Sequence, residues 1–483
     1  MNATEPVRRW ASQTPDAVAY ESVTGVSITY AHLERTVDAV ARRARSIGLL
    51  PGQTAAIAVA NHYRFIVAAL ALGRIGVAFA PATLPAHLTD VLLQGRGTAE
   101  NGCARIVAFD DVWPDTILRS GVEPETMHDD GAAILMHCPS SGTTGGPKFV
   151  PVTHALALRR VDANAFGPGA GAIAGVRQAC YITAASSYGF SSVMFAFDCG
   201  GTVLQPIDEG RELAGWLLRS KVDRLVASPI ALKRMAEALP AVRAPNHLAT
   251  IEAGGGMLAP SVYELVRERM CANVFINYGS TECGRVAGAP ASRIVGKPGA
   301  AGYAYPGVEI QAVDDDDAPL PAGREGIVRI RSERNASGYL DNAQASADTF
   351  RDGWVYPGDR GVVEADGLLR VVGRVDDVIN LGGTKVNPQA IEDAIMALGD
   401  VREVAVFGAS ADGGATVICA VIVPTGTLDV DAYHRRYREQ LGAHAPALVM
   451  QVGALPRNAN GKVLRHELTR IAVEADRRRN TRG

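Results

Sequence analysis

The feature of this sequence that most restricts its fold is a repeated alternation of short apolar runs with amphipathic helical segments. A β-like run at 54–59 lies between two segments with helical spacing, 30–47 and 63–75. The same alternation returns between residues 178 and 276. Strands that alternate with helices of about 10–15 residues are typical of βαβ units, because each helix carries the chain back to the start of the next parallel strand. We therefore predict an α/β fold with mainly parallel sheets.

The pattern changes after about residue 295, where short β-like runs between acidic or glycine-containing turns predict a small antiparallel, barrel-like subdomain. A compact α+β segment follows from about residue 375. Its expected elements are helices at 388–398 and 430–441 and strands at 401–407 and 416–423. We predict a large N-terminal domain of stacked α/β sheets with the barrel-like subdomain (1–374), a hinge (375–376) and a small, mobile C-terminal α+β lid domain (377–483).

The charge balance and the apolar content narrow the class of function. The 48 basic and 51 acidic residues give a net charge of −3, which argues against nucleic acid as a partner, because its binding needs a basic excess. We see no apolar run of the roughly 18 residues that span a membrane, and the first ten residues lack the apolar core of a secretory signal. The seven cysteines never show CxxC spacing. We expect neither a disulfide framework nor a zinc site, and a reducing cytoplasm as the location.

Lysine is rare in this chain, since only six of the 48 basic residues are lysines. A compact ammonium and a planar guanidinium are not interchangeable. A retained lysine is therefore a candidate for a position that requires a point charge. Three of the six, Lys148, Lys385 and Lys462, lie in glycine-rich or turn-like segments.

The strongest local signal is the segment 140–148, with the sequence Ser-Ser-Gly-Thr-Thr-Gly-Gly-Pro-Lys. Its glycines let backbone N–H groups face an anion, and its hydroxyls and lysine add donors, so it is typical of a phosphate-binding loop. It is not a Walker A loop, because Pro147 and Phe149 flank the lysine. The alternative is a flexible surface linker, which would not need Pro147 and Lys148. The candidate phosphate-binding residues are Ser140, Ser141, Gly142, Thr143, Thr144 and Lys148.

This segment resembles the signature of the adenylate-forming superfamily, which includes acyl- and aryl-CoA synthetases, firefly-type luciferases and peptide-synthetase adenylation domains. Further segments resemble motifs of that superfamily in the same order. They are Gly254 to Leu258, Asn277 to Glu282, Tyr356 to Asp359, Gly373 to Val386 and Pro456 to Val463. The resemblance covers nearly the whole chain. It implies ATP-dependent activation of a carboxylate through an acyl-adenylate, with release of pyrophosphate.

The resemblance also implies roles for single residues. Thr281 would contact the α-phosphate, Glu282 would hold Mg²⁺, and Lys462 would be the catalytic cation between carboxylate and phosphate. Tyr278 would face the adenine, and Asp359 would accept the ribose hydroxyls. The implied ATP/AMP site further contains Gly255, Gly256, Asn277, Gly279 and Arg374. Ordinary alternatives stay open: a half-buried tyrosine for Tyr278, a turn-capping aspartate for Asp359 and a solvated turn lysine for Lys462.

The acyl pocket would be built by the segment 183–192. Its implied residues are Ser186, Tyr188, Gly189, Phe190 and Gly254. Relatives that activate α-amino acids carry an aspartate in this segment, and this chain has none. A buried ammonium without a carboxylate is costly, so we expect an acid without an α-amino group.

The last implied features concern the thiol step. Asp376 would be the pivot of the lid, and Gly382, Gly383 and Lys385 would line the channel for the thiol, although a surface hairpin is an equal alternative for that segment. The acceptor would be coenzyme A, or else the phosphopantetheine of a carrier protein.

We therefore expect an AMP-forming acid–thiol ligase that uses ATP, Mg²⁺ and coenzyme A, acts on a small carboxylic acid, and is a monomer or homodimer. Two other classes are weaker alternatives. A noncatalytic nucleotide-binding protein would not need the full set of charged motif residues. A dinucleotide-binding oxidoreductase would need GxGxxG, whereas the glycines at 167–175 are spaced GxGxGxxxG.

Overall fold

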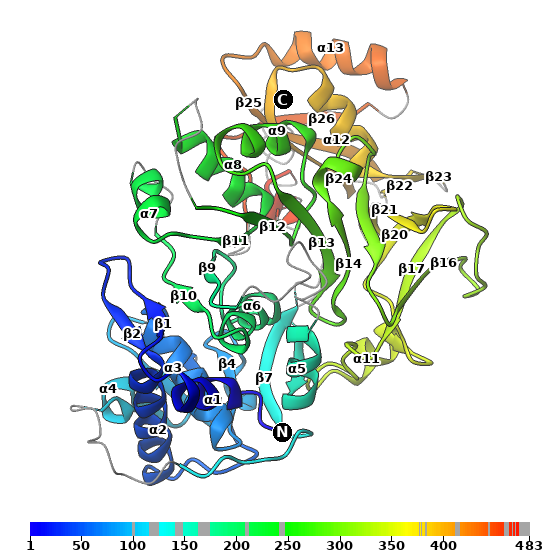
Figure 1. Ribbon diagram of the computed structural model, residues 1–483. Coiled ribbons are helices and arrows are strands. Elements are labelled where there is room, and N and C mark those ends of the chain that lie inside the picture. Colours follow the sequence, from blue (N-terminus) through cyan, green and yellow to red (C-terminus); the bar gives the residue numbers. More distant parts are fainter. Residues whose placement is uncertain are drawn as a thin grey trace. The chain divides into compact units, whose positions relative to one another are not determined.

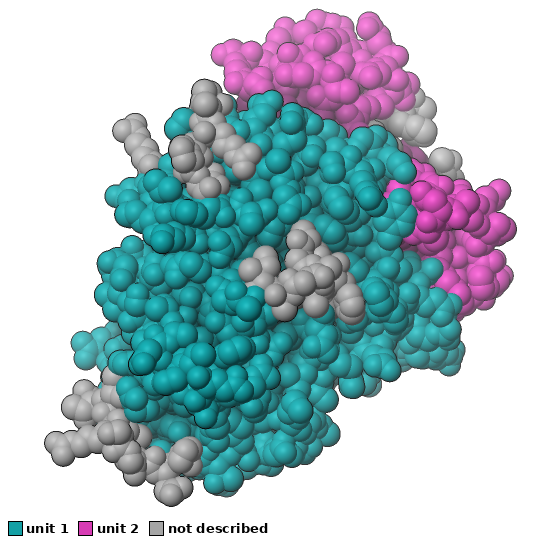
Figure 2. All heavy atoms as spheres, in the orientation of Figure 1, with its two compact units in different colours: residues 1–141, 146–310, 330–357 teal, residues 142–145, 311–329, 358–483 magenta. Residues whose placement is uncertain are grey.

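The computed structural model divides the chain into two compact units. It describes residues 1–98, 102–114, 125–140, 148–162, 174–207, 212–240, 247–375, 377, 379–381, 384–410, 416–442, 445–457, 463–465, 467–468 and 470–472. Unit 1 comprises residues 1–141, 146–310 and 330–357, and unit 2 comprises residues 142–145, 311–329 and 358–483 (Figure 2). Among the described residues, no helix combines the length and the apolar composition that crossing a membrane requires.

One sheet of unit 1 has six strands in the order β6-β5-β3-β4-β7-β8. The strands are β3 (Thr54–Ala58), β4 (Ala78–Pro81), β5 (Val91–Gln94), β6 (Ile106–Ala108), β7 (Ile134–Ser140) and β8 (Lys148–Thr153). Neighbours in this sheet run parallel except for the antiparallel pair β7 and β8. Helices α2 (Tyr30–Ser46) and α3 (His62–Arg74) precede and follow β3 along the chain. The predicted elements at 30–47, 54–59 and 63–75 are thus confirmed.

A second sheet of unit 1 contains the strand order β2-β1-β10-β9-β11-β12-β13-β14-β15. Its strands are β1 (Val18–Glu21), β2 (Ser27–Thr29), β9 (Arg177–Cys180), β10 (Thr202–Leu204), β11 (Arg224–Ala227), β12 (Thr250–Ala253), β13 (Val274–Ser280), β14 (Gly284–Pro290) and β15 (Ala300–Ala304). The run from β1 to β13 is parallel, and β14 and β15 are antiparallel additions. The alternation predicted between 178 and 276 is therefore a series of βαβ units.

Helices join the successive parallel strands of this second sheet (Figure 1). They are α6 (Ser187–Asp198), α7 (Leu213–Arg219), α8 (Pro229–Ala238) and α9 (Pro260–Arg269). Several helix starts are encoded locally, because a polar N-cap side chain satisfies a backbone N–H that has no partner within the helix. Thr29 accepts from the N–H of His32 at the start of α2, and Ser228 accepts from that of Ala231 at the start of α8.

The main hydrophobic core of unit 1 surrounds α3. All residues of α3 from Phe65 to Arg74 are buried, as expected for a helix that is apolar on every side. Helices α1 (Glu5–Gln13), α2 and α3 lie side by side (Figure 1). Arg74 is the charged exception in this core, and ion pairs with Asp38 and Glu34 of α2 neutralise its charge. The core continues into α6 and α5 (His154–Asp162).

The smaller elements of unit 1 are α4 (Phe109–Val112), the 3₁₀ turn η1 (Ala86–Leu88), α10 (Ala291–Ile294), α11 (Ala343–Thr349), β18 (Phe350–Arg351) and β19 (Trp354–Val355). Strands β16 (Val308–Val313) and β17 (Glu325–Ser332) pair with each other. Each of these two strands crosses from one unit to the other along its length.

Unit 2 contains antiparallel strands followed by an α+β segment. Strand β20 (Asp359–Val363) pairs antiparallel with β21 (Leu368–Arg374) and with the first part of β17, which confirms the predicted antiparallel character of this region. The later elements are β22 (Ile379–Leu381), β23 (Thr384–Val386), α12 (Pro388–Ala397), β24 (Val401–Ser410), β25 (Thr416–Pro424), α13 (Val430–Leu441) and β26 (Leu448–Gln451). The helices and strands predicted after residue 388 are all present.

The predicted domain boundary stays a prediction. Compactness groups residues 358–374 with the segment that follows them, whereas the sequence motifs favour a pivot at 375–376. The proposed pivot Asp376 lies outside the described residues.

The start of α6 offers a test of local packing. We expect Gly189→Ala to destabilise the protein by about 2 kcal/mol, because the new Cβ would lie 2.1 Å from the carbonyl oxygen of Thr183. The matched control is Gly215→Ala in α7, where the new Cβ would meet only the flexible end of Arg219. This control should be neutral or slightly stabilising, because alanine has the higher helix propensity. The test is the melting temperature of each variant in thermal unfolding. Equal melting temperatures would contradict the close contact at Gly189.

Candidate active site

The two ends of the predicted phosphate-binding loop are held together by the sheet. Strand β7 ends at Ser140, β8 begins at Lys148, and these two residues are antiparallel partners. The intervening residues, which include the candidates Ser141, Gly142, Thr143 and Thr144, lie outside the described part of the chain. Strands β7 and β8 thus fix where the predicted loop begins and ends.

Glu282 lies in the turn between β13 and β14, and its carboxylate meets Ser140 although the two residues are 142 positions apart. The hydroxyl of Ser140 donates to Oε1 of Glu282, and the neighbouring Thr281 hydroxyl donates to the carbonyl oxygen of Pro139 at 3.3 Å. Burial raises the pKa of Glu282, but hydrogen bonds from Ser140, Ser280 and Tyr339 outweigh it and hold that pKa below its ordinary value. The structure thus brings three predicted site residues together around an ionised carboxylate.

Tyr339 is a site residue that the sequence analysis missed. Its hydroxyl donates to Oε1 of Glu282 at 2.8 Å. The Nζ atom of Lys148 lies 5.2 Å from the centre of its ring, a distance suited to a cation–π contact. Tyr339 follows β17 in a segment without a distinctive pattern. Its 57-residue separation from Glu282 explains why no local signal could have found it.

The donor set around Glu282 fits Mg²⁺. This cation prefers oxygen ligands and usually binds through one or two carboxylates together with phosphate oxygens and water. Glu282 supplies a buried, ionised carboxylate, and Ser140 and Thr281 supply hydroxyl oxygens nearby. Within the described part of the chain, no group of three or more His, Cys, Asp or Glu side chains could hold a metal by itself. A cation here would therefore take some of its ligands from a bound phosphate.

The predicted adenine-side residues lie along β13 and β12. Tyr278 is half-buried on β13, and the buried Asn277 accepts a hydrogen bond from the hydroxyl of Tyr305. Gly279 has a packing reason of its own, because a Cβ there would lie 1.9 Å from the carbonyl oxygen of Gly284. Gly255 follows β12 and has φ +79°, a backbone conformation that favours glycine. Gly256 is the next residue along this turn.

The predicted acyl residues separate into different environments. Ser186 is the N-cap of α6, accepting from the N–H of Gly189 at 3.2 Å. Tyr188 is half-buried, and Gly254 packs so closely on its ring that a Cβ at 254 would lie 2.6 Å from it. Tyr188 and Gly254 are thus neighbours, as the predicted pocket requires, whereas Ser186 is committed to helix capping.

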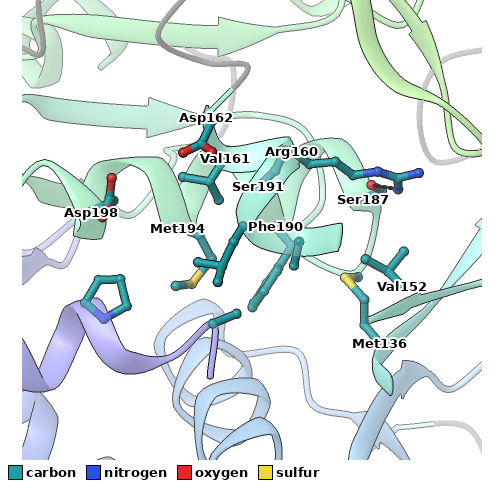
Figure 3. A pocket seen from close by; sticks show the side chains of 14 residues that line it. Met136, Val152, Arg160, Val161, Asp162, Ser187, Phe190, Ser191, Met194 and Asp198 are labelled. Carbon is teal, nitrogen blue, oxygen red and sulfur yellow. Dashed lines mark hydrogen bonds between the residues drawn. The ribbon is translucent and has the colours of Figure 1, made fainter. Parts of the chain in front are cut away.

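Phe190 points to the other side of α6, into a small cavity lined mostly by apolar side chains (Figure 3). The cavity has a volume of about 40 Å³ and also contacts Met136, Val161 and Met194. Pockets for small-molecule ligands usually measure about 300–1,000 Å³. This cavity is therefore a packing defect of the core and is too small for a substrate.

A buried ion cluster that the sequence analysis did not anticipate lies beside Tyr188. Glu252 of β12 is fully buried and forms ion pairs with Arg224 and Arg285, and the Tyr188 hydroxyl donates to its Oε1 at 3.0 Å. Burial raises the pKa of Glu252, but the two arginines outweigh this effect and hold it below its ordinary value. Burial and the same carboxylate raise the pKa of Tyr188 well above its usual range. The Glu252 carboxylate is thus already paired with two guanidinium groups.

The remaining predicted residues belong to unit 2. Asp359 is buried and accepts a hydrogen bond from Arg374 at 2.8 Å, and the two residues are antiparallel partners on β20 and β21. Lys385 lies on β23, which pairs antiparallel with β22, and its role in a thiol channel stays a prediction. Lys462, Asp376, Gly382 and Gly383 lie outside the described residues.

Comparisons with known proteins return one family along most of the chain. The family model described as AMP-binding enzyme matches residues 7–340, and that described as AMP-binding enzyme C-terminal domain matches residues 390–462. The chain is 28% identical over 482 residues to 2-succinylbenzoate–CoA ligase of Bacillus licheniformis, covering 96% of this chain and 98% of that enzyme. It is 27% identical over 496 residues to feruloyl-CoA synthase of Amycolatopsis sp., with the same coverage of 96% and 98%.

Solved structures share the fold. The o-succinylbenzoate coenzyme A synthetase of Bacillus subtilis in complex with AMP matches with a TM-score of 0.84 at 23% identity, over 96% of this chain and 97% of that one. The amide bond synthetase of Marinactinospora thermotolerans matches with a TM-score of 0.81 at 24% identity, over 97% and 99%. These likenesses confirm the predicted α/β fold with a large N-terminal part and a small C-terminal part.

The hydrogen bond from Tyr339 to Glu282 generates a pH-dependent prediction. We expect Tyr339→Phe to destabilise the protein by about 2 kcal/mol at neutral pH, because a hydrogen bond to a charged group is lost. Glu282 has a lowered pKa, so this stabilisation is fully present above the ordinary pKa of a glutamate, about 4.3. It disappears as the pH falls through the lowered pKa, where the carboxylate becomes protonated in both proteins.

The matched control is Tyr30→Phe, which removes a 2.7 Å hydrogen bond to the carbonyl oxygen of Gly201. That acceptor does not titrate, so the loss of stability in Tyr30→Phe should not depend on pH. Melting temperatures at pH 7 and at the lowest pH at which the protein stays folded provide the comparison. A loss for Tyr339→Phe that is constant with pH would show that the tyrosine does not bind the ionised carboxylate.

Proposed function

Because this chain belongs to the family of AMP-binding enzymes, we propose that it is an ATP-dependent ligase that joins a carboxylic acid to coenzyme A. In the first step the carboxylate attacks the α-phosphate of ATP, the bond to the β-phosphate oxygen breaks, and pyrophosphate leaves. In the second step the thiolate of coenzyme A attacks the acyl carbon and AMP leaves, which yields the thioester. The two relatives named above are CoA ligases. Each aligns over 96% of this chain and 98% of its own length.

The observation that carries this proposal is the ionised, buried Glu282 carboxylate beside the ends of the predicted phosphate loop. Adenylation brings two anions together, so their repulsion must be reduced before they react. Bound Mg²⁺ would supply positive charge to the phosphates at this place. We assign Glu282 to hold the cation, Ser140, Lys148 and the intervening loop to bind the β- and γ-phosphates, and Thr281 to contact the α-phosphate.

The nucleoside would be held by the residues of the predicted nucleotide-binding motifs. We assign Tyr278, Asn277, Gly279 and the turn at 254–256 to the adenine side. Asp359, which Arg374 orients through its 2.8 Å hydrogen bond, would accept the ribose hydroxyls. Lys462 would place its ammonium between the reacting oxygens.

The acid substrate is proposed to lack an α-amino group. Tyr188 and Gly254 would line the acyl pocket, and the carboxylate nearest to them, Glu252, is already neutralised by two arginines. An incoming ammonium would meet two guanidinium groups and a carboxylate that is already paired with them. Segment 183–192 contains no aspartate, and Glu252 beside Tyr188 is paired with two arginines, so both features disfavour an α-ammonium.

We also propose a cytoplasmic location and a movement of the C-terminal lid. Each of the seven cysteines is a free thiol, which supports a reducing cytoplasm. We propose that the lid turns about Asp376 between the two steps, so that Lys462 acts in the first step, and Gly382, Gly383 and Lys385 form the channel for the thiol in the second.

The decisive experiment is ATP–pyrophosphate exchange with a panel of benzoic, cinnamic, fatty, dicarboxylic and amino acids. Exchange with at least one acid, followed by thioester formation with coenzyme A in single turnover, supports the proposal. Transfer only to a phosphopantetheinylated carrier protein would change the acceptor. Absence of exchange with every acid, at saturating Mg·ATP and with folded protein, would contradict an adenylating function.

We expect Lys462→Ala to slow adenylation about 100- to 1,000-fold, because a charge directed at the transition state is lost. Thioester formation from presynthesised acyl-adenylate should change far less. The control is Lys233→Ala, which removes a half-buried helix lysine of α8 whose Nζ lies 4.0 Å from Oε1 of Glu237. Equal loss of both half-reactions in the Lys462 variant would assign the residue a structural role.

Because the carboxylate beside Tyr188 is already paired with two arginines, we expect the enzyme to discriminate between two acids that share a skeleton and differ in an α-ammonium. We expect kcat/KM in pyrophosphate exchange to be at least about 100-fold lower for phenylalanine than for 3-phenylpropanoate, corresponding to about 2.7 kcal/mol. The two compounds differ only in the α-ammonium, so hydrophobic contacts cancel. Comparable rates for both would disprove the proposed exclusion of α-amino acids.

A further inference from the structure

Arg160 is a buried cation for which neither the motifs nor the proposed reaction gives a role. It lies near the end of α5 and is 3% exposed. Figure 3 shows its side chain directed away from the apolar side chains of the small cavity and toward Ser187. A guanidinium in such a place must find hydrogen-bond acceptors, because an uncompensated buried charge is strongly destabilising.

The acceptors of Arg160 come from three other segments of unit 1. Its Nη1 donates to the Ser187 hydroxyl at 2.8 Å. Its Nη2 donates to the backbone carbonyl oxygen of Glu282 at 3.0 Å. Both Nε and Nη2 donate to the carbonyl oxygen of Arg334, at 3.2 and 3.1 Å. Since two of the acceptors are main-chain carbonyls, Arg160 fixes the path of the backbone at Glu282 and Arg334.

The turn that carries Glu282 rests directly on this side chain. Gly284 has φ +69°, and a Cβ there would lie 3.2 Å from Cγ and Nε of Arg160. The Glu282 carbonyl oxygen also accepts from the N–H of Ala336 at 2.7 Å. The turn is thereby attached both to α5 and to the segment that leads to Tyr339.

Arg160 therefore holds two segments that meet again at one carboxylate. The first segment supplies Glu282 itself, and the second supplies Tyr339, whose hydroxyl donates to Glu282. A lysine could not replace the arginine here, because one ammonium nitrogen on a flexible stem cannot reach acceptors spread across the width of a guanidinium.

We infer that Arg160 is a positioning residue for the metal-binding carboxylate: it holds the backbone of Glu282 and of the Tyr339 segment in the arrangement that binds the cation of Mg·ATP. This inference rests on the proposed function, in which Glu282 holds Mg²⁺. Outer contacts of this kind commonly change metal affinity when they are removed.

The test compares Arg160→Lys with Arg74→Lys. Arg74 is also fully buried in unit 1, but its partners are Glu34 and Asp38 of α2. Mn²⁺ replaces Mg²⁺ as the probe, and its binding in the presence of ATP is followed by electron paramagnetic resonance, beside the melting temperature. We expect about 10- to 100-fold weaker Mn²⁺ binding in Arg160→Lys. We expect Arg74→Lys to lose thermal stability with Mn²⁺ binding unchanged.

A second variant covers the case in which Arg160→Lys fails to fold. Ser187→Ala removes one small hydroxyl that anchors the guanidinium, and we expect about 3- to 5-fold weaker Mn²⁺ binding. Unchanged Mn²⁺ binding in the foldable variants, or equal weakening in Arg74→Lys, would overturn the inference. A wild-type protein that binds no Mn²⁺ with ATP and shows no pyrophosphate exchange would instead refute the proposed function.

Discussion

A carboxylate that remains ionised while buried is the constraint on which the candidate site depends. Water is the best solvent for such a charge, so removing Glu282 from water requires donors that the protein must bring from elsewhere. Those donors are hydroxyls from the end of β7 and from the segment after β17, far apart along the chain. The two segments are therefore held in one geometry by their hydrogen bonds to this carboxylate.

The second buried carboxylate shows how different donors produce a different chemistry. Glu252 is neutralised by two guanidinium groups, and double ion pairing makes its charge unavailable to a ligand. Glu282 accepts hydrogen bonds from the neutral hydroxyls of Ser140 and Tyr339, which preserve its negative charge and orient it. The first arrangement leaves no unpaired negative charge at Glu252 for a cationic ligand, and the second is suited to attracting a cation that accompanies phosphate.

Much of the fold could be predicted from the sequence, because periodicity is a local property. The helices at 30–47 and 63–75 and the strand between them were predictable from spacing alone. Contacts such as Ser140–Glu282 joined residues that motifs had already identified. The roles of Arg160, Tyr339 and Glu252 were not predictable, since each depends on acceptors or donors that only the tertiary structure brings near. Ser186 caps α6, a local role that its motif position did not indicate, and its place in the acyl pocket stays a prediction.

Helix α6 has two faces with different surroundings, so substitutions on one face have different consequences from substitutions on the other. Phe190 and Met194 face the apolar cavity, whereas Tyr188, Ser192 and Phe195 contact the Glu252 cluster and its arginines. Substitutions on the first face alter packing and hence the yield of folded protein. Substitutions on the second face alter polarity beside the proposed acyl pocket. A lineage of such enzymes could therefore drift toward a new acid through the second face while the first continues to maintain the core.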